Sequence, residues 1–453
     1  MKKAIQLSVG AVVFVAWLWC GASLYFLIAG RDIAPPDLSA YEVPNPDLPS
    51  EMNAYTFIKD YALNHPTNVN WKVANDCLLG KTNWNDCVEL LKGVLAAESN
   101  AFRCVEGVMA SRGLSVPPPK YHAFVADVCL CLRVDKLYRV KSMLEAGSGN
   151  IATGRATLME LFRFGKRLVE LDEGMSHLIG EALENIALIE MAKPLFAPDG
   201  DEAWLVELQK MTSAMGVGAA DRTKRSIRYT LALGGAGYLK YGLPQLAKHR
   251  IVSALKLNWI PGYSGYAFQE NRTLAALKEE TERFVSKIDA PYDIEYARKF
   301  KFGRWTIRSP RELVNPLSRN WFGRKKIEDY GFGGTYCRFF VQQFFVRSQG
   351  AILACRRYMA RCGRYPDRLE ELVPESLDAV PLDPFDGKPL RYNAEHHYIW
   401  TPGPELTFGG NVDFTPEGKP MWTSTRRRDY ANVRFIYPED VSSSTSLFKD
   451  KAR

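Results

Sequence analysis

The sequence lacks the short motifs that mark several common classes of enzyme. It contains no P-loop, no dinucleotide-binding G-x-G-x-x-G and no H-E-x-x-H zinc motif. No C-x-x-C is present either, which disfavours a zinc ribbon and a thioredoxin-type redox site. These absences lead us to expect a protein that is not an enzyme.

The chain also lacks a strong charge of one sign. It has 59 Lys and Arg against 51 Asp and Glu in 453 residues, which gives a net charge of +8. Its basic runs are short, and no predicted helix or strand carries a sustained basic stripe with interleaved aromatic residues. We therefore expect no nucleic-acid partner. The length exceeds one usual hydrophobic core, so we expect two or three folded units.

Charge is missing altogether from Ala4 to Gly30. An apolar stretch of roughly 20 residues is enough to span a bilayer, and this one is longer than the apolar region of a signal peptide. Lys2 and Lys3 precede it, which places the N-terminus in the cytoplasm. We predict a transmembrane signal-anchor at 1–30 in the inner membrane, with its cleavage left open. A Pro-rich tether at 31–52 would then lead to a periplasmic, extracytoplasmic bulk of the chain.

Eight of the nine cysteines lie outside the apolar stretch. An even number in an exported domain favours disulfides. Cys77 and Cys87, which flank LLGKTNWND, are the best local candidates for a pair. Cys355 and Cys362 lie about 10 Å apart along a predicted helix, which is too far for a bond. The alternative is that all eight are buried free thiols.

Apolar residues at helical spacing dominate the middle of the chain. We predict helices at 53–63, 121–145, 151–171, 175–192, 201–215 and 268–289, with another between 77 and 95. The short links between them are typical of antiparallel helical hairpins, so we expect an α-helical domain over 53–300. An irregular connector at 301–335 would precede a long helix from about 336 to 361, whose apolar stripe indicates burial.

The segment after this helix contains a dense set of turn signals. Gly363 is a usual helix stop, and a short helix is expected between Asp367 and Pro374. The LDPFDG turn at 382–387 should lead into two strands, around 389–392 and 397–400. We predict a small α+β cap that completes a module over 336–425, followed by a polar tail at 426–453.

Residues 336–415 resemble the C-terminal module of type II secretion major pseudopilins. The residues that carry the resemblance follow a long helix in the order Gly363, Tyr365, Pro366, Leu369, Leu372, Pro381, Asp383, Pro384, Phe385, Gly387, Pro389 and Tyr392. The chain as a whole is similar to membrane-anchored envelope proteins of planctomycete and verrucomicrobial type, which implies no activity. The stretch 4–30 lacks the glutamate that pseudopilins carry near their mature N-terminus, so a fibre subunit is not expected.

The resemblance implies a calcium site in the loop TPGPELTFGGNVDF at 401–414. Glu405, Asn411 and Asp413 stand at the matching positions, although Glu405 replaces the usual aspartate. Carboxylate, amide and backbone oxygens are the ligands that calcium prefers. The alternative is an Asn/Gly turn held by its own hydrogen bonds.

Together these features favour a mainly α protein that acts as a membrane-anchored scaffold or binding protein, tied to a secretion or envelope assembly. One alternative is an envelope hydrolase with a cleft in the helical domain, because the predicted helix at 175–192 carries Glu181, Glu184 and Glu190. A converging pocket would support it, and a solid helical core would count against it. The other is a minor pseudopilin-like fibre component.

Overall fold

The computed structural model is mostly helical (67%) with one small three-stranded sheet. It describes residues 2–38, 48–66, 71–78, 84–116, 121–198, 200–231, 265–266, 268–299, 319–320, 323–324, 332–410, 412 and 433–436. Two compact units are present. The first comprises 1–44, 227–286 and 296–335, and the second comprises 45–226, 287–295 and 336–453.

The first unit contains the helix α1 (Lys2–Ala29) and most of α15 (Glu270–Ile288). The chain leaving α1 is bound at the start of α15, where the Asp32 carboxylate accepts hydrogen bonds from the backbone of Asn271 and Arg272 at 2.6 and 3.0 Å. An acidic side chain is favourable at a helix N-terminus because the first amides have no partner within the helix. Gln269 adds bonds to the carbonyls of Ala29 and Arg31.

The predicted transmembrane anchor at 1–30 is wrong on this structure. Among the residues that it describes, no helix is long and apolar enough to cross a bilayer. This finding also contradicts the predicted signal-anchor and the single-pass, inner-membrane and periplasmic location.

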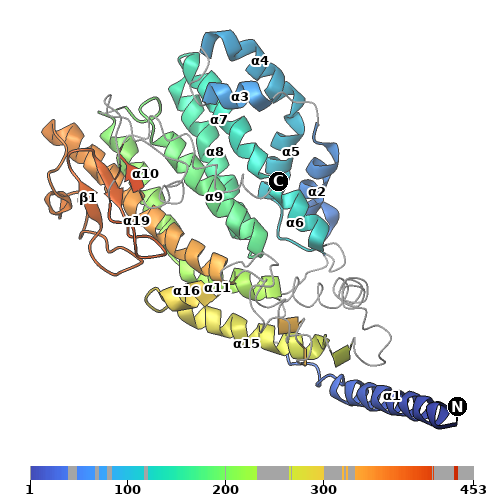
Figure 1. The fold of residues 1–453 in the computed structure, drawn as a ribbon. Coiled ribbons are helices and arrows are strands. Elements are labelled where there is room, and N and C mark those ends of the chain that lie inside the picture. The colour runs from blue at the N-terminus through green and yellow to red at the C-terminus, as the bar shows by residue number, and fades with distance from the viewer. Residues whose placement is uncertain are drawn as a thin grey trace. The chain divides into compact units, whose positions relative to one another are not determined.

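The second unit is built mainly from helices that follow one another closely. Its helices and short 3₁₀ turns are η2 (Ser50–Met52), α2 (Ala54–Asn64), α3 (Trp71–Leu78), α4 (Trp84–Ala97), α5 (Ser99–Ala110), α6 (Tyr121–Cys129), α7 (Leu132–Gly147), α8 (Ile151–Val169), α9 (Gly174–Met191), α10 (Glu202–Gly216) and η8 (Leu369–Leu372). It also holds most of α11 (Ala219–Thr230) and α19 (Phe332–Cys362), and the start of α16 (Ile294–Lys299). In Figure 1, α7, α8 and α9 lie side by side, with α3 and α4 near one end of α7.

Capping residues set where several of these helices begin. Asn53 accepts from the Tyr55 amide before α2, and Asn150 accepts from the Thr153 amide before α8. Glu173 accepts from the amides of Met175 and Ser176 before α9. Each cap satisfies amides that the helix itself leaves unpaired.

Helices α8 and α9 approach each other closely at two glycines. A Cβ atom added to Gly180 would lie 2.5 Å from the Gly165 carbonyl oxygen, and one added to Gly165 would lie 2.8 Å from the Gly180 carbonyl oxygen. The two glycines therefore allow the backbones to touch. This contact fixes the α8–α9 hairpin, which is the central feature of the helical core.

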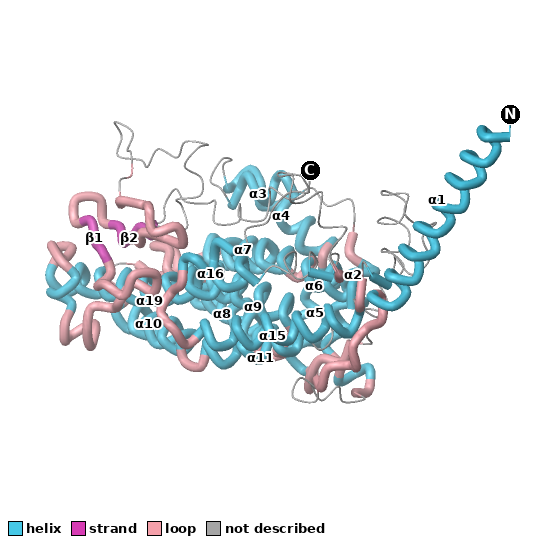
Figure 2. The backbone as a smooth tube through the Cα atoms, turned by 60° about the horizontal axis from the view of Figure 1, so that its bottom comes forward, coloured by secondary structure: helices cyan, strands magenta, loops and turns pink. Residues whose placement is uncertain are grey.

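The sheet follows the long helix. Strands β1 (Arg391–Asn393), β2 (Tyr398–Trp400) and β3 (Val433–Phe435) pair antiparallel in the order β1-β2-β3. Tyr392 pairs with Ile399, which in turn pairs with Arg434. We call residues 363–410 together with 433–436 the cap. Figure 2 shows β1 and β2 beside α19.

The predicted disulfides are also contradicted. Among the described cysteines, no two lie at disulfide distance from one another. Cys87 is buried in an apolar cluster with Leu78, Leu91 and Val140, where it packs as a small apolar residue. The side chain of Cys77 lies outside the described residues. Cys355 and Cys362 are both free on the continuous helix α19, as expected from their spacing.

Candidate functional site

The LDPFDG turn of the cap is a closed loop of backbone hydrogen bonds. The Asp383 amide donates to the Lys388 carbonyl at 2.6 Å, and the Gly387 amide donates to the Asp383 carbonyl at 2.9 Å. Gly387 has a φ of 70°, a conformation that glycine adopts without strain. Leu382 and Pro389 form a β-bridge that closes the base of the turn. The backbone therefore places the two aspartates of the turn in fixed positions.

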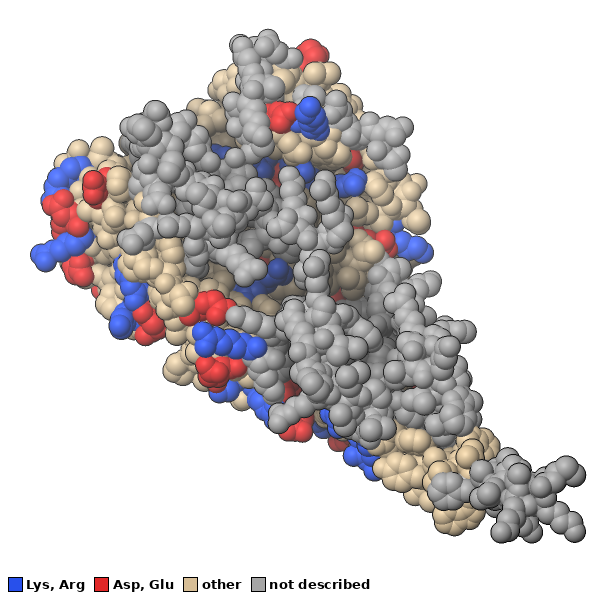
Figure 3. Space-filling model, viewed as in Figure 1, with Lys and Arg blue, Asp and Glu red and all other residues tan. Residues whose placement is uncertain are grey.

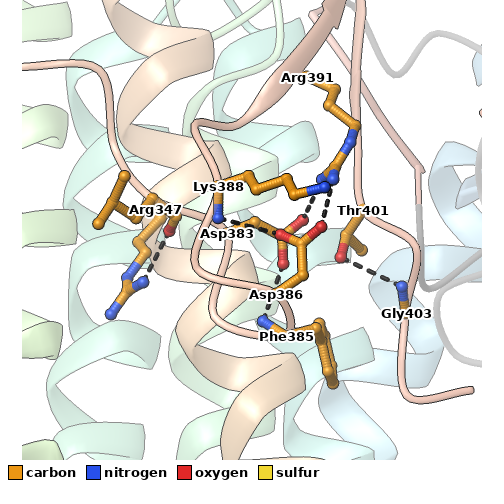
Figure 4. A network of polar contacts seen from close by, with 9 residues as sticks. Arg347, Asp383, Phe385, Asp386, Lys388, Arg391, Thr401 and Gly403 are labelled. Atoms are coloured by element: carbon orange, nitrogen blue, oxygen red, sulfur yellow. Dashed lines mark hydrogen bonds and ion pairs between the residues drawn. The ribbon is translucent and has the colours of Figure 1, made fainter. Parts of the chain in front are cut away.

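Asp383 lies at the centre of a polar network (Figure 4). Its carboxylate is fully buried and accepts from the Phe385 amide at 2.9 Å and from Arg391 at 3.1 Å. Arg391 also pairs with Asp386, which in turn accepts from the Lys388 amide at 3.1 Å. One guanidinium thus joins both aspartates of the turn to strand β1.

The electrostatics of Asp383 are those of a buried structural acid. Burial raises the pKa of its carboxyl, while the Phe385 amide, Thr401 and Arg391 oppose that rise. Arg391 lies 5.0 Å from the ring of Trp400 on β2, so its position is fixed from both sides. This arrangement can clamp the turn to the sheet, and it does not leave Asp383 open to a substrate.

Polar side chains from α19 and a neighbouring segment fasten the cap to the helices. Arg347 on α19 donates to the Leu382 carbonyl at 2.6 Å. Tyr292 donates to the Pro404 carbonyl at 2.8 Å, and its ring lies 4.9 Å from that of Phe385. Arg347 thus holds the LDPFDG turn against α19, and Tyr292, whose ring stacks on Tyr336 of α19, holds the loop at 401–410.

A second set of contacts holds the other end of the cap. Arg361 near the end of α19 pairs with Glu375 at 2.8 Å and donates to the Ser376 hydroxyl at 2.7 Å. Gln209 on α10 donates to the Ser376 carbonyl at 2.7 Å. Tyr358 donates to Glu371 at 2.8 Å. The segment after η8 is therefore bound to both α10 and α19.

Strand β3 carries an arginine that faces the long helix. The Arg434 guanidinium lies 4.2 Å from the Phe345 ring and donates to the Gln349 side chain at 2.6 Å. Burial lowers the pKa of Arg434 to about 10. This strand lies within residues 426–453, which were expected to form a polar tail. The apolar residues of VRFI at 433–436 are only a weak signal for a strand.

Only part of the predicted calcium site lies among the described residues. Glu405 lies on the exposed side of the 401–410 loop, while Asn411 and Asp413 lie outside the described residues. In the described parts of the chain, no group of three or more His, Cys, Asp or Glu side chains is arranged to hold a metal ion. The calcium site therefore stays a prediction.

The three glutamates predicted on the 175–192 helix have different surroundings on α9. Glu190 pairs with Arg139 at 2.9 Å and with Lys193 at 2.8 Å. Glu181 lies 3.3 Å from His177. Glu184 is 7% exposed, and burial together with the charge of Glu181 raises its pKa to about 8. The structure does not bring the three carboxylates together at an open surface.

The chain matches no known family model, and comparison with curated proteins and with solved structures finds no similar protein. Its candidate site therefore has to be judged from its own geometry. That geometry is a cap held by buried ion pairs and backbone hydrogen bonds, with its outer loops exposed.

Proposed function

We propose that this chain is a non-catalytic scaffold or binding protein whose cap contacts components of a secretion or envelope assembly. The proposal rests on the contacts that the prominent polar residues of the cap make. Asp383, Arg391 and Arg347 are bound to other groups of the chain rather than directed at an open pocket. Groups used in this way stabilise a recognition surface rather than perform chemistry.

The outer loops of the cap supply a surface for such a partner. Leu382 is 51% exposed and Leu406 is 40% exposed. Hydrogen bonds from Arg347 and Tyr292 nevertheless hold the backbone of the loops in which they lie. On the face shown in Figure 3, the described basic and acidic side chains are interspersed. Apolar anchors within a mixed polar rim are typical of protein contacts.

The resemblance of residues 336–415 to the major pseudopilin module supports the choice of partner class. Fixing the loops before binding lowers the entropic cost of association, because the partner does not have to order them. The proposal concerns the cap alone and requires no activity from the helical core.

The test is chemical cross-linking in intact cells, followed by mass spectrometry of the purified protein. The proposal predicts cross-linked peptides that join residues 336–425 to secretion or envelope-assembly proteins. Links that arise only from the helices between 53 and 230, with none from the cap, would overturn it. A variant with exposed Leu406 changed to Asp should lose the links, while Leu90→Asp on α4 should retain them.

The hydrolase alternative depends on Glu184. Its raised pKa is what a general acid requires. However, the Glu184 side chain packs against Gly165, because a Cβ added to that glycine would lie 3.1 Å from Glu184 Cγ. A carboxyl group in this position cannot reach a substrate without opening the α8–α9 hairpin. Hydrolysis of envelope polysaccharide that is lost in Glu184→Gln would nevertheless favour this alternative.

A further inference from the structure

One face of α9 carries a row of ionisable side chains that the proposed function does not use. His177, Glu181 and Glu184 follow at intervals of four and three residues, which places them on the same side of the helix. All three are largely buried, and the exposed fractions of the His177 and Glu181 side chains are 4% and 14%. Among the described residues, neither ring nitrogen of His177 makes a hydrogen bond of good geometry, although Nε2 lies 3.3 Å from a carboxylate oxygen of Glu181. We call these three residues the acidic row.

The acidic row lies at the junction between α9 and three other helices. Glu184 packs against Gly165 on α8, where the two backbones touch. The other charges that act on Glu184 are Lys166 on α8, Glu170 directly after α8 and Arg222 on α11. Arg338 on α19 faces Glu181, and the neighbouring Asn185 exchanges hydrogen bonds with Gln342 of α19 at 2.6 and 3.1 Å.

The net charge of this junction depends on whether the Glu184 carboxyl holds a proton. Two carboxylates one turn apart repel each other when both are ionised, and burial adds a cost for the second charge. A neutral Glu184 fits beside Gly165 and leaves Glu181 as the single negative charge facing Arg338. An ionised Glu184 would place a second negative charge beside the backbone contact between α8 and α9.

We propose that the acidic row is a proton-dependent clasp: protonated Glu184 keeps α9 closed on α8, and loss of that proton loosens α9 and, through Asn185 and Gln342, the helix α19 that carries the cap. The clasp would make the cap's support weaker in alkaline conditions. This regulatory role rests on the proposed function of the cap, whereas the clasp itself does not require the cap to have a partner.

The test is hydrogen–deuterium exchange of the full chain between about pH 6 and about pH 9, corrected for the intrinsic pH dependence of exchange. The wild type should lose about tenfold in protection across α8, α9 and α19 over this range, while α2 and α5 change much less. Glu184→Gln should remove the loss. Glu207→Gln, which removes an exposed charge on α10, should behave as the wild type.

Two further variants should move the midpoint of the loss in opposite directions. Glu181→Gln removes the repelling charge and should shift it to lower pH, whereas Lys166→Gln removes an attracting charge and should shift it to higher pH. The same loss of protection in Glu184→Gln and wild type, or midpoints that do not move, would overturn the clasp. Such a result would leave the cap's cross-links, and hence the proposed function, unaffected.

Discussion

At the scale of single residues, the molecule places ionisable groups inside its fold and pairs most of them. Asp383 is fully buried and forms an ion pair with Arg391. Glu190 is also buried and forms ion pairs with Arg139 and Lys193. A buried ion pair contributes little net stability compared with apolar residues, but the loss of one partner leaves an uncompensated charge. Substitutions that remove one partner therefore reveal which pairs maintain the cap.

Asp383→Ala should destabilise the protein by about 3 kcal/mol, because it leaves Arg391, Thr401 and the Phe385 amide without their shared acceptor. Asp386→Ala removes a more exposed carboxylate from the same guanidinium and should cost about 1 kcal/mol. Urea denaturation of both variants measures the difference. Equal losses would mean that the buried position of Asp383 has no special role.

Titration of Asp135 on α7 should lower the free energy of unfolding as the pH rises from about 4 to about 6. Burial raises the pKa of Asp135 from 3.8 to about 6, and the charge of Glu190 adds to the rise. The folded state thus holds a proton that the unfolded state has already lost, so the stability present below about pH 4 is lost as the pH rises through about 6.

The isosteric variant Asp135→Asn should lack this component of the pH dependence. From about pH 4 to about pH 7 its free energy of unfolding should rise relative to the wild type by roughly 2–3 kcal/mol, the value that the pKa change implies. Chemical denaturation across this range measures the change. Wild-type and variant curves that stay parallel would show that Asp135 titrates normally in the folded protein.

At the scale of elements, the helices could be predicted from apolar spacing and breakers. The expected helices at 151–171 and 175–192 are α8 (Ile151–Val169) and α9 (Gly174–Met191), and the long helix runs over Phe332–Cys362. The expected helix at 121–145 divides into α6 and α7 around Leu130, where no glycine or proline marks the break. Cys131, which lies at the break, is fully buried.

The backbone contact between α8 and α9 could not be predicted in the same way. Gly165 and Gly180 appear in the sequence as weak points within helices, because glycine lowers helix propensity. These glycines favour packing only because each one faces a partner helix at close range. A sequence pattern does not show which helix that is. The polar groups of the cap share this limitation: the LDPFDG turn was predicted, but the contacts of Arg347 with that turn and of Arg434 with α19 arise only in the fold.

Gly180→Ala should destabilise the protein by about 2 kcal/mol or more, because the new methyl group would meet the Gly165 carbonyl and the Val169 backbone nitrogen below 3 Å. Gly350→Ala in α19 provides the matched control. A Cβ there has no atom within 4 Å, so helix propensity should stabilise this variant by about 0.5–1 kcal/mol. Thermal unfolding of the two proteins compares them, and similar melting temperatures would refute the backbone contact.

At the scale of the whole molecule, the chain consists of two units, each assembled from separate stretches. Helices α11, α15, α16 and α19 contribute residues to both. The apolar N-terminal stretch suggested a transmembrane anchor, and the even cysteine number suggested disulfides, but the structure contradicts both. Both predictions were drawn from composition, by way of the cellular compartment that it suggested. Composition does not show how the side chains pack within the chain.

The central claim is that the cap is the binding module. Its most direct test is a photo-reactive amino acid introduced in living cells at Leu406, in the exposed 401–410 loop, and in parallel at Leu90 on α4. If the cap is the binding module, Leu406 should give a discrete cross-linked product that contains a secretion or envelope-assembly protein, and Leu90 should give no such product. Cross-linking from Leu90 alone, or identical products from both positions, would contradict it and locate the function in the helical core.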